Sequence, residues 1–132
     1  MDANAMRAVV ERFLSAFNAA DLAGMRSVLD DELVAYTTNA TGGETRVDGA
    51  DNYVGAISAM DLPAADFTVA MTQQPVLVDN DRVLIMVEVR ARRGTRRLHN
   101  FAAHLVQVRE GRITQMRMVE AKPADSDAFW SQ

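Results

Sequence analysis

Residues 82–120 read RVLIMVEVRARRGTRRLHNFAAHLVQVREGRITQMRMVE, and this stretch decides the fold class. The odd positions of its first part are apolar, at Val83, Ile85, Val87 and Val89. This period of two is typical of a β-strand with one buried face. Gly94-Thr95 fits a two-residue hairpin loop of type II′, which takes glycine first, and Glu110-Gly111 makes a second tight turn. The stretch therefore predicts consecutive antiparallel strands over 82–92, 96–109 and 112–121.

Shorter strand patterns precede this stretch. Phe67, Val69 and Met71 alternate with polar or small residues. The period resumes at Val76 after Pro75, and a proline at this point marks a bulge or a sheet edge. The second half of the chain is therefore a meander of strands.

The first half of the chain has helical periodicity. Apolar residues recur at helical spacing from Met6 to Ala20, which predicts an amphipathic helix over 5–19. Asp21 is an N-cap candidate for a short second helix, and Asp48 is one for a third helix. Between these helices, 33–37 has the pattern of a short strand and 38–46 that of a loop. The third helix should end at the sequence Asp-Leu-Pro, residues 61–63.

Helices followed by a meander predict an α+β fold with the helices on one face of a curved sheet. The 132 residues, 48% hydrophobic and 24% charged, suit one globular domain over 1–132. Cysteine is absent, which excludes disulfides and Cys-ligated metal sites. The chain starts with no secretory-type leader and has no apolar run of about 18 residues. We expect a cytoplasmic protein that does not enter a membrane.

Basic residues gather in the strand region although the net charge is −4. Arginines crowd the first hairpin at positions 90, 92, 93, 96 and 97. Such a cluster fits a nucleic-acid patch or a charged hairpin tip that resists edge pairing. No aromatic residues interleave with these arginines and the whole chain is acidic, so we expect no nucleic-acid partner.

Two segments resemble the nuclear transport factor 2-like superfamily, in its ketosteroid isomerase and SnoaL-like branch. They are VVERFLSAFNAADLAGMRSVLDDELV at 9–34 and HLVQVREGRITQMRMVE at 104–120. The resemblance implies a conical barrel in which three N-terminal helices pack inside a strongly bent antiparallel sheet around an apolar pocket. It also implies a homodimer through the outer sheet face. Members of this superfamily include isomerases, cyclases, hydrolases and non-catalytic binders, so the fold does not fix the function.

The catalytic groups of two known branches do not carry over. Ketosteroid isomerase uses an Asp base and an oxyanion hole made of a Tyr and a neutral Asp, an example often used to illustrate pKa tuning. The matching positions here are Thr37, Phe13 and Ala103. Limonene epoxide hydrolase shares an acidic position at Glu88, but its arginine and its water-activating aspartate match Met86 and Met118.

Strand alternation and the two tight turns bring a set of side chains to one face, which the resemblance implies faces the pocket. In that set Glu88 or Glu120 is the candidate base, His99 the acid and Arg90 the anchor for an anionic oxygen. The candidate ligand-binding residues are Phe13, Phe17, Thr37, Ile57, Met86, Arg90, Phe101, Ala103, Met116, Met118 and Trp130. His104 is expected on the opposite face from His99, which excludes a two-histidine metal site, and no cofactor is expected.

The residues leave open which face of the predicted sheet lines the pocket. The odd face of 82–92 is the more apolar one, and if it is the interior then Glu88 and Arg90 form an ordinary outward-facing salt bridge. Two functions stay open as well. In the first, the chain is expected to be a pocket protein for a small, largely apolar molecule of polyketide, terpenoid or steroid type, with or without cofactor-independent isomerase, cyclase or hydrolase activity. The alternative is a non-catalytic binding or interaction module.

Overall fold

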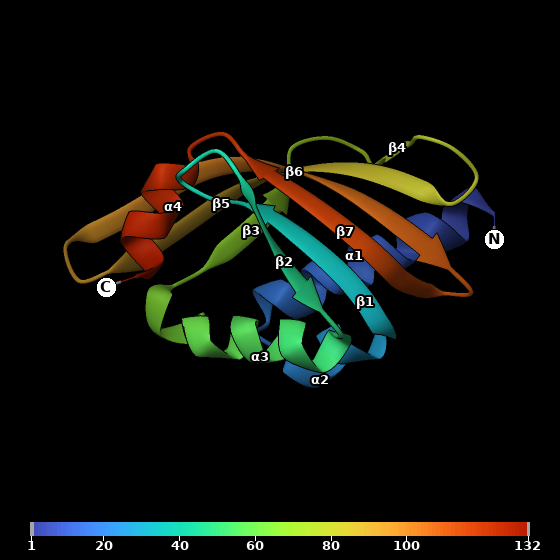
Figure 1. The fold of residues 1–132 in the computed structure, drawn as a ribbon, viewed down its shortest axis with the longest axis horizontal. Coiled ribbons are helices and arrows are strands. Elements are labelled where there is room, and N and C mark those ends of the chain that lie inside the picture. The colour runs from blue at the N-terminus through green and yellow to red at the C-terminus, as the bar shows by residue number, and fades with distance from the viewer. Residues whose placement is uncertain (1, 132) are drawn as a thin grey trace.

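The computed structural model describes residues 2–131, which form a mixed α+β fold (Figure 1). The helices are α1 (Ala3–Asn18), α2 (Leu22–Ser27), α3 (Ala50–Met60), the 3-10 turn η1 (Pro63–Ala65) and α4 (Pro123–Trp130). The strands are β1 (Leu29–Thr38), β2 (Glu44–Asp48), β3 (Thr68–Met71), β4 (Val76–Leu77), β5 (Arg82–Arg93), β6 (Arg96–Arg109) and β7 (Arg112–Glu120).

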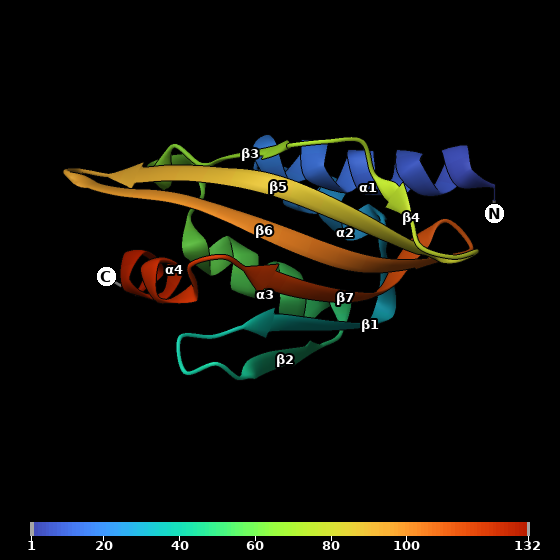
Figure 2. The same ribbon diagram turned by 90° about the horizontal axis from the view of Figure 1, so that it is seen from above.

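One curved, open sheet contains all the strands in the order β2-β1-β7-β6-β5-β3, with β4 paired to β5 (Figure 2). The predicted meander is confirmed at both tight turns, because Arg93 pairs with Arg96 and Arg109 pairs with Arg112. The expectation of a wholly antiparallel sheet is wrong at one place. β1 runs parallel to β7, with Ala35 opposite Met116, because β7 completes the sheet beside the first strand of the chain.

The helical half differs from the prediction in three details. The segment 38–46, expected as a loop, contributes most of β2, which forms a hairpin with β1. The third helix is capped by Gly49 with φ 90° rather than by Asp48, because Asp48 ends β2. The tail forms α4, so the fold has a C-terminal helix as well as three earlier ones. Asp21 is confirmed as an N-cap, since its side chain accepts a hydrogen bond from Gly24 N at 2.9 Å.

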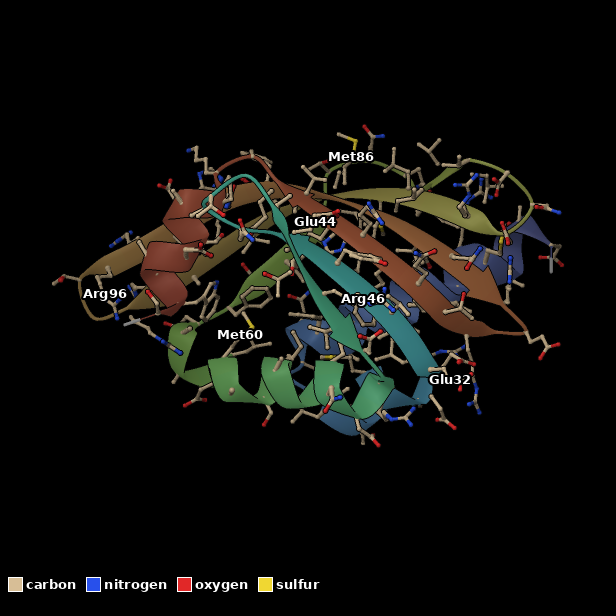
Figure 3. The ribbon with its side chains drawn as sticks, in the orientation of Figure 1. Glu32, Glu44, Arg46, Met60, Met86 and Arg96 are labelled. Atoms are coloured by element: carbon tan, nitrogen blue, oxygen red, sulfur yellow. The ribbon has the colours of Figure 1, made fainter. Side chains whose placement is uncertain are left out.

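The apolar face of α1 packs on the concave side of the sheet. Val10 and Phe13 from α1 are almost fully buried, together with Val83, Ile85 and Val87 from the odd face of β5. The odd face of β5 is therefore the interior. In Figure 3, Met60 points inward from the end of α3, whereas Met86 on the even face of β5 points away from the helices.

A β-bulge changes the pattern of faces in the last hairpin. Val108 pairs with Ile113, as the tight turn requires, but the next pair is Gln107 with Gln115. Thr114 is the extra residue, and its hydroxyl donates to Gln107 Oε1 at 3.0 Å. Beyond the bulge, even-numbered residues of β7 share the inner face with even-numbered residues of β6.

Candidate functional site

An apolar cavity of about 340 Å³ lies between the inner face of the sheet and helices α1, α3 and α4. Its apolar lining comes from every layer of the fold and includes Phe13, Phe17, Val47, Ile57, Met60, Phe67, Met116, Met118 and Trp130. Four aromatic rings form a continuous wall: Phe13 contacts Phe17, Phe17 contacts Phe67, and Phe67 contacts Trp130, with centroid distances of 5.7, 5.4 and 6.1 Å. The lining can enclose an irregular apolar ligand.

One row of residues across the sheet brings three polar side chains to the cavity. Strand register places His104 of β6, Met118 of β7, Thr37 of β1 and Thr45 of β2 side by side. All four line the cavity. This row therefore offers one imidazole and two hydroxyl groups to a molecule that rests on the sheet.

The imidazole of His104 has no hydrogen-bond partner among residues 2–131. Its neighbours in the row are Ile85 and Met118, which supply no polar group. Burial lowers the pKa of His104 to about 4 because the apolar surroundings disfavour the charged form. The imidazole is neutral near pH 7 and carries one donor and one acceptor nitrogen.

Tyr53 presents a hydroxyl from the helical side. It lines the cavity from α3 and packs against Phe13 with a centroid distance of 6.3 Å. Burial alone raises its pKa far above the ordinary value, so the phenol stays protonated. No residue between 2 and 131 hydrogen-bonds to this hydroxyl.

Glu120 lies at the α4 end of the cavity, and its carboxyl group is hydrogen-bonded to other side chains of the protein. Its Oε2 accepts from Ser126 Oγ and from Asn100 Nδ2, the latter at 3.3 Å. Desolvation raises the pKa of Glu120; the Ser126 hydrogen bond opposes this rise and the charge of Asp127 adds to it. Asp127 also lines the cavity, and its Oδ2 accepts from Ala40 N at 3.0 Å.

Arginines of the first hairpin hold α4 against the cavity. Arg96 Nη1 donates to Phe129 O at 3.2 Å, and Arg93 donates to Met60 O and lies 5.3 Å from the Trp130 ring centroid. Arg92 forms an ion pair with Asp66 at 3.1 Å. The arginine cluster is therefore used partly for internal contacts at the hairpin tip.

Six predicted site residues lie outside the cavity, on the outer face of the sheet. They are Met86, Glu88, Arg90, His99, Phe101 and Ala103. Glu88 Oε2 lies 2.6 Å from His99 Nε2 and 3.2 Å from Arg90 Nη2, which is the outward salt bridge left open above. The hydrogen bond with His99 lowers the pKa of Glu88, and the charge of Arg90 acts in the same direction. Glu88 and His99 therefore meet each other but not Glu120.

The other predicted residues do line the cavity: Phe13, Phe17, Thr37, Ile57, Met116, Met118, Glu120 and Trp130. The prediction that the six residues of β5 and β6 face the cavity is wrong for one reason. An unbulged last hairpin would put Phe101 opposite Glu120, whereas the bulge at Thr114 puts Ala102 there. The same shift brings His104, which was expected on the other face, into the cavity. The apolar odd face of β5 was the available signal.

Within residues 2–131, no three His, Asp or Glu side chains are arranged so that they could hold a metal ion. Over the same residues, none of the helices has the length and apolar character needed to cross a membrane.

Helices packed into a curved sheet around one apolar cavity define a class of small α+β pocket proteins. Compared with protein families, residues 10–116 match the SnoaL-like domain. The chain belongs to the SnoaL-like family. Its fold is similar to that of an NTF2-like protein of Cytophaga hutchinsonii, with a TM-score of 0.67 at 13% identity.

Individual relatives agree with this assignment. The uncharacterised protein Rv0034 of Mycobacterium tuberculosis H37Rv is 32% identical over 126 residues, which span 93% of this chain and 94% of that protein. Bal32a, from a soil-derived mobile gene cassette, has a TM-score of 0.81 at 20% identity and covers 97% of this chain and 98% of its own. An LEH-like epoxide hydrolase of M. tuberculosis has a TM-score of 0.74 at 24% identity, with coverage of 89% and 83%. These two structures support the fold alone.

Proposed function

We propose that this protein binds a small, largely apolar molecule of polyketide, terpenoid or steroid type in the cavity. The observation that carries the proposal is a 340 Å³ space lined by aromatic and methionine side chains. This volume falls within the range of about 300–1,000 Å³ of known ligand pockets. Methionine side chains adapt to irregular apolar shapes, and both Met116 and Met118 lie on the sheet wall.

Binding is favoured over acid/base catalysis by the state of two titratable groups of the cavity, His104 and Glu120. His104 and Glu120 are diagonal neighbours in the β6–β7 register, about 7–8 Å apart. A pKa of about 4 makes the His104 imidazole a weak base near neutral pH, where a good catalytic base has a pKa close to 7. Glu120 is already occupied by Ser126 and Asn100.

An enzyme that works without a cofactor is the second candidate. The raised pKa of Glu120 favours it, because a carboxyl group that stays protonated at higher pH can serve as a general acid. The LEH-like neighbour suggests hydrolysis as one reaction to test. Turnover of an epoxide that is lost in Glu120→Gln and kept in Glu88→Gln would favour this candidate.

The binding test uses 1-aminoanthracene, whose fluorescence rises in apolar surroundings. Met118 and Val119 are adjacent in β7 and face opposite sides, Met118 toward the cavity and Val119 with 52% of its surface exposed. Met118→Trp fills the cavity and should weaken binding at least about tenfold, whereas Val119→Trp adds the same bulk outside and should not. No binding to the wild-type protein, or equal weakening in both variants, would contradict the proposal.

The proposal includes a cytoplasmic homodimer formed through the outer sheet face. It is supported by apolar side chains on that face, with Met86 39%, Phe101 42% and Val119 52% exposed. Sedimentation velocity of wild type and Phe101→Arg tests it. A wild-type monomer at micromolar concentration would contradict the dimer.

A further inference from the structure

Two polar side chains of the cavity have hydrogen-bonding capacity that the protein leaves unused. Within residues 2–131, neither the His104 imidazole nor the Tyr53 hydroxyl has a hydrogen-bond partner. Over the same range, no side-chain nitrogen or oxygen is both sealed from solvent-sized probes and unpaired. The polar atoms of His104 and Tyr53 therefore border open space, and that space is the cavity they line.

The charged residue types that line the cavity are acidic and not basic. Its ionisable acidic side chains are Glu120 and Asp127, and no arginine or lysine of the described chain is among its lining residues. His104 does not supply the missing cation, since burial keeps its imidazole neutral. A ligand carboxylate or phosphate would enter an apolar space that holds carboxyl groups and no counter-charge, which is unfavourable.

We infer that the ligand is an uncharged, mostly apolar molecule with a hydroxyl group, and that His104 selects it by hydrogen bonding to that hydroxyl. The inference rests on the proposed function and makes it more specific. A hydroxyl can donate to the bare nitrogen of a neutral imidazole or accept from its N–H. An ether or carbonyl oxygen can only accept, which would leave the bare nitrogen unpaired.

The apolar neighbours of His104 make it selective. Ile85 and Met118 flank it in the sheet and offer no competing polar group. A ligand hydroxyl is thus the partner that removes the cost of an unpaired polar group beside an apolar ligand. The rest of the ligand would contact the aromatic wall from Phe13 to Trp130.

Three compounds with one naphthalene body test the inference by isothermal titration calorimetry: 2-naphthol, 2-methoxynaphthalene and 2-naphthoate. Wild type should bind 2-naphthol roughly threefold to tenfold more tightly than 2-methoxynaphthalene, the value of one net hydrogen bond. It should bind 2-naphthoate at least about tenfold more weakly than either, because the anion meets acidic side chains and no cationic side chain in the lining.

The chain offers a matched pair of variants for this test. Its two histidines lie on the same strand and face opposite sides, His104 toward the cavity and His99 outward beside Glu88. His104→Leu should abolish the preference for 2-naphthol over its methyl ether while both still bind, and His99→Leu should keep it. In wild type, the imidazole NMR signals of His104 should shift on adding 2-naphthol, which gives a readout even where His104→Leu folds poorly.

The outcomes distinguish a failure of this inference from a failure of the proposed function on which it rests. Equal affinity for 2-naphthol and its ether, a preference that survives His104→Leu, or tighter binding of 2-naphthoate would overturn the role of His104 while the cavity remains a binding site. Failure of both neutral compounds to bind wild type would overturn the proposed function itself.

Discussion

Asn100→Ala should be among the most damaging single changes outside the apolar core. Asn100 is 1% exposed at the junction of β6, the end of β7 and α4. Its Nδ2 donates to Lys122 O and Ser126 Oγ, both at 2.9 Å. Its Oδ1 accepts from Phe101 N at 2.9 Å and from Lys122 N at 3.0 Å. One amide thus joins the sheet to the start of the last helix.

The cost follows from the groups that the alanine leaves without partners. The amide and carbonyl of Lys122 and the amide of Phe101 lose their side-chain partner, and each such group costs about 1–3 kcal/mol when it stays unpaired. Lys122 is exposed, so water can replace part of this loss. We therefore expect the free energy of unfolding to fall by about 3 kcal/mol and Tm by roughly 10 °C.

Guanidinium unfolding followed by the fluorescence of Trp130, the single tryptophan, measures this loss where it occurs. Asn52→Ala is the matched control, because exposed Asn52 donates one hydrogen bond, to Asp48 O at 2.9 Å. It should cost less than about 1 kcal/mol. A loss for Asn100→Ala within about 0.5 kcal/mol of the control would refute the account of this junction.

Three further outcomes are expected. Because the pKa of His104 is about 4 in the folded state, below its ordinary value, the unfolded chain binds this proton more readily, and stability falls as pH falls from about 6.5 toward 4. His104→Leu should remove about 2–3 kcal/mol of the loss in unfolding free energy between pH 7 and pH 4.5, while His99→Leu keeps it. Deletion of Thr114 removes the extra residue and leaves Gln115 directly after Ile113, so Met116 and Met118 should stay on the inner face and 1-aminoanthracene binding should be kept; lost binding would contradict the assignment of Thr114 as the extra residue. With Phe13 and Thr37 in place of a Tyr donor and an Asp base, the enone absorbance of a β,γ-unsaturated ketosteroid should not rise above the buffer rate, because one lost oxyanion donor alone costs about a hundredfold.

The regular parts of this fold could be predicted from local patterns. Alternating apolar residues and the Gly94 and Gly111 turns identify the β5–β6–β7 meander, since a tight turn sets the register of its own hairpin. β2 was not identified, because an exposed edge strand has no buried face to give it an alternating pattern. The C-terminal helix also gave little signal. Contacts with other elements hold it: Asn100 and Arg96 hydrogen-bond to it, Arg93 lies over the Trp130 ring, and Phe129 is buried in a cluster with Leu98.

The prediction of the candidate site from the sequence depended on one non-local feature, the bulge at Thr114. Residues of α1 and β1 were placed correctly, because Phe13 and Thr37 follow from the faces of those elements alone. The faces of β5, β6 and β7 also depend on the register, and one extra residue, Thr114, reverses their relation. A bulge arises from how two strands pair and twist, so the composition around it does not identify it. His104 was missed for this reason.

The parallel pairing of β1 with β7 has a consequence for how the chain acquires its structure. β1 is synthesised well before β7, its partner on one side. Contacts between such distant segments raise the contact order and slow folding, because a long loop must close before they form. Until β7 is made, the edge of β1 that pairs with it in the finished sheet has no partner strand (Figure 1). Nascent chains that end before Arg112 should therefore remain sensitive to protease, and protection should appear only after β7 has been released.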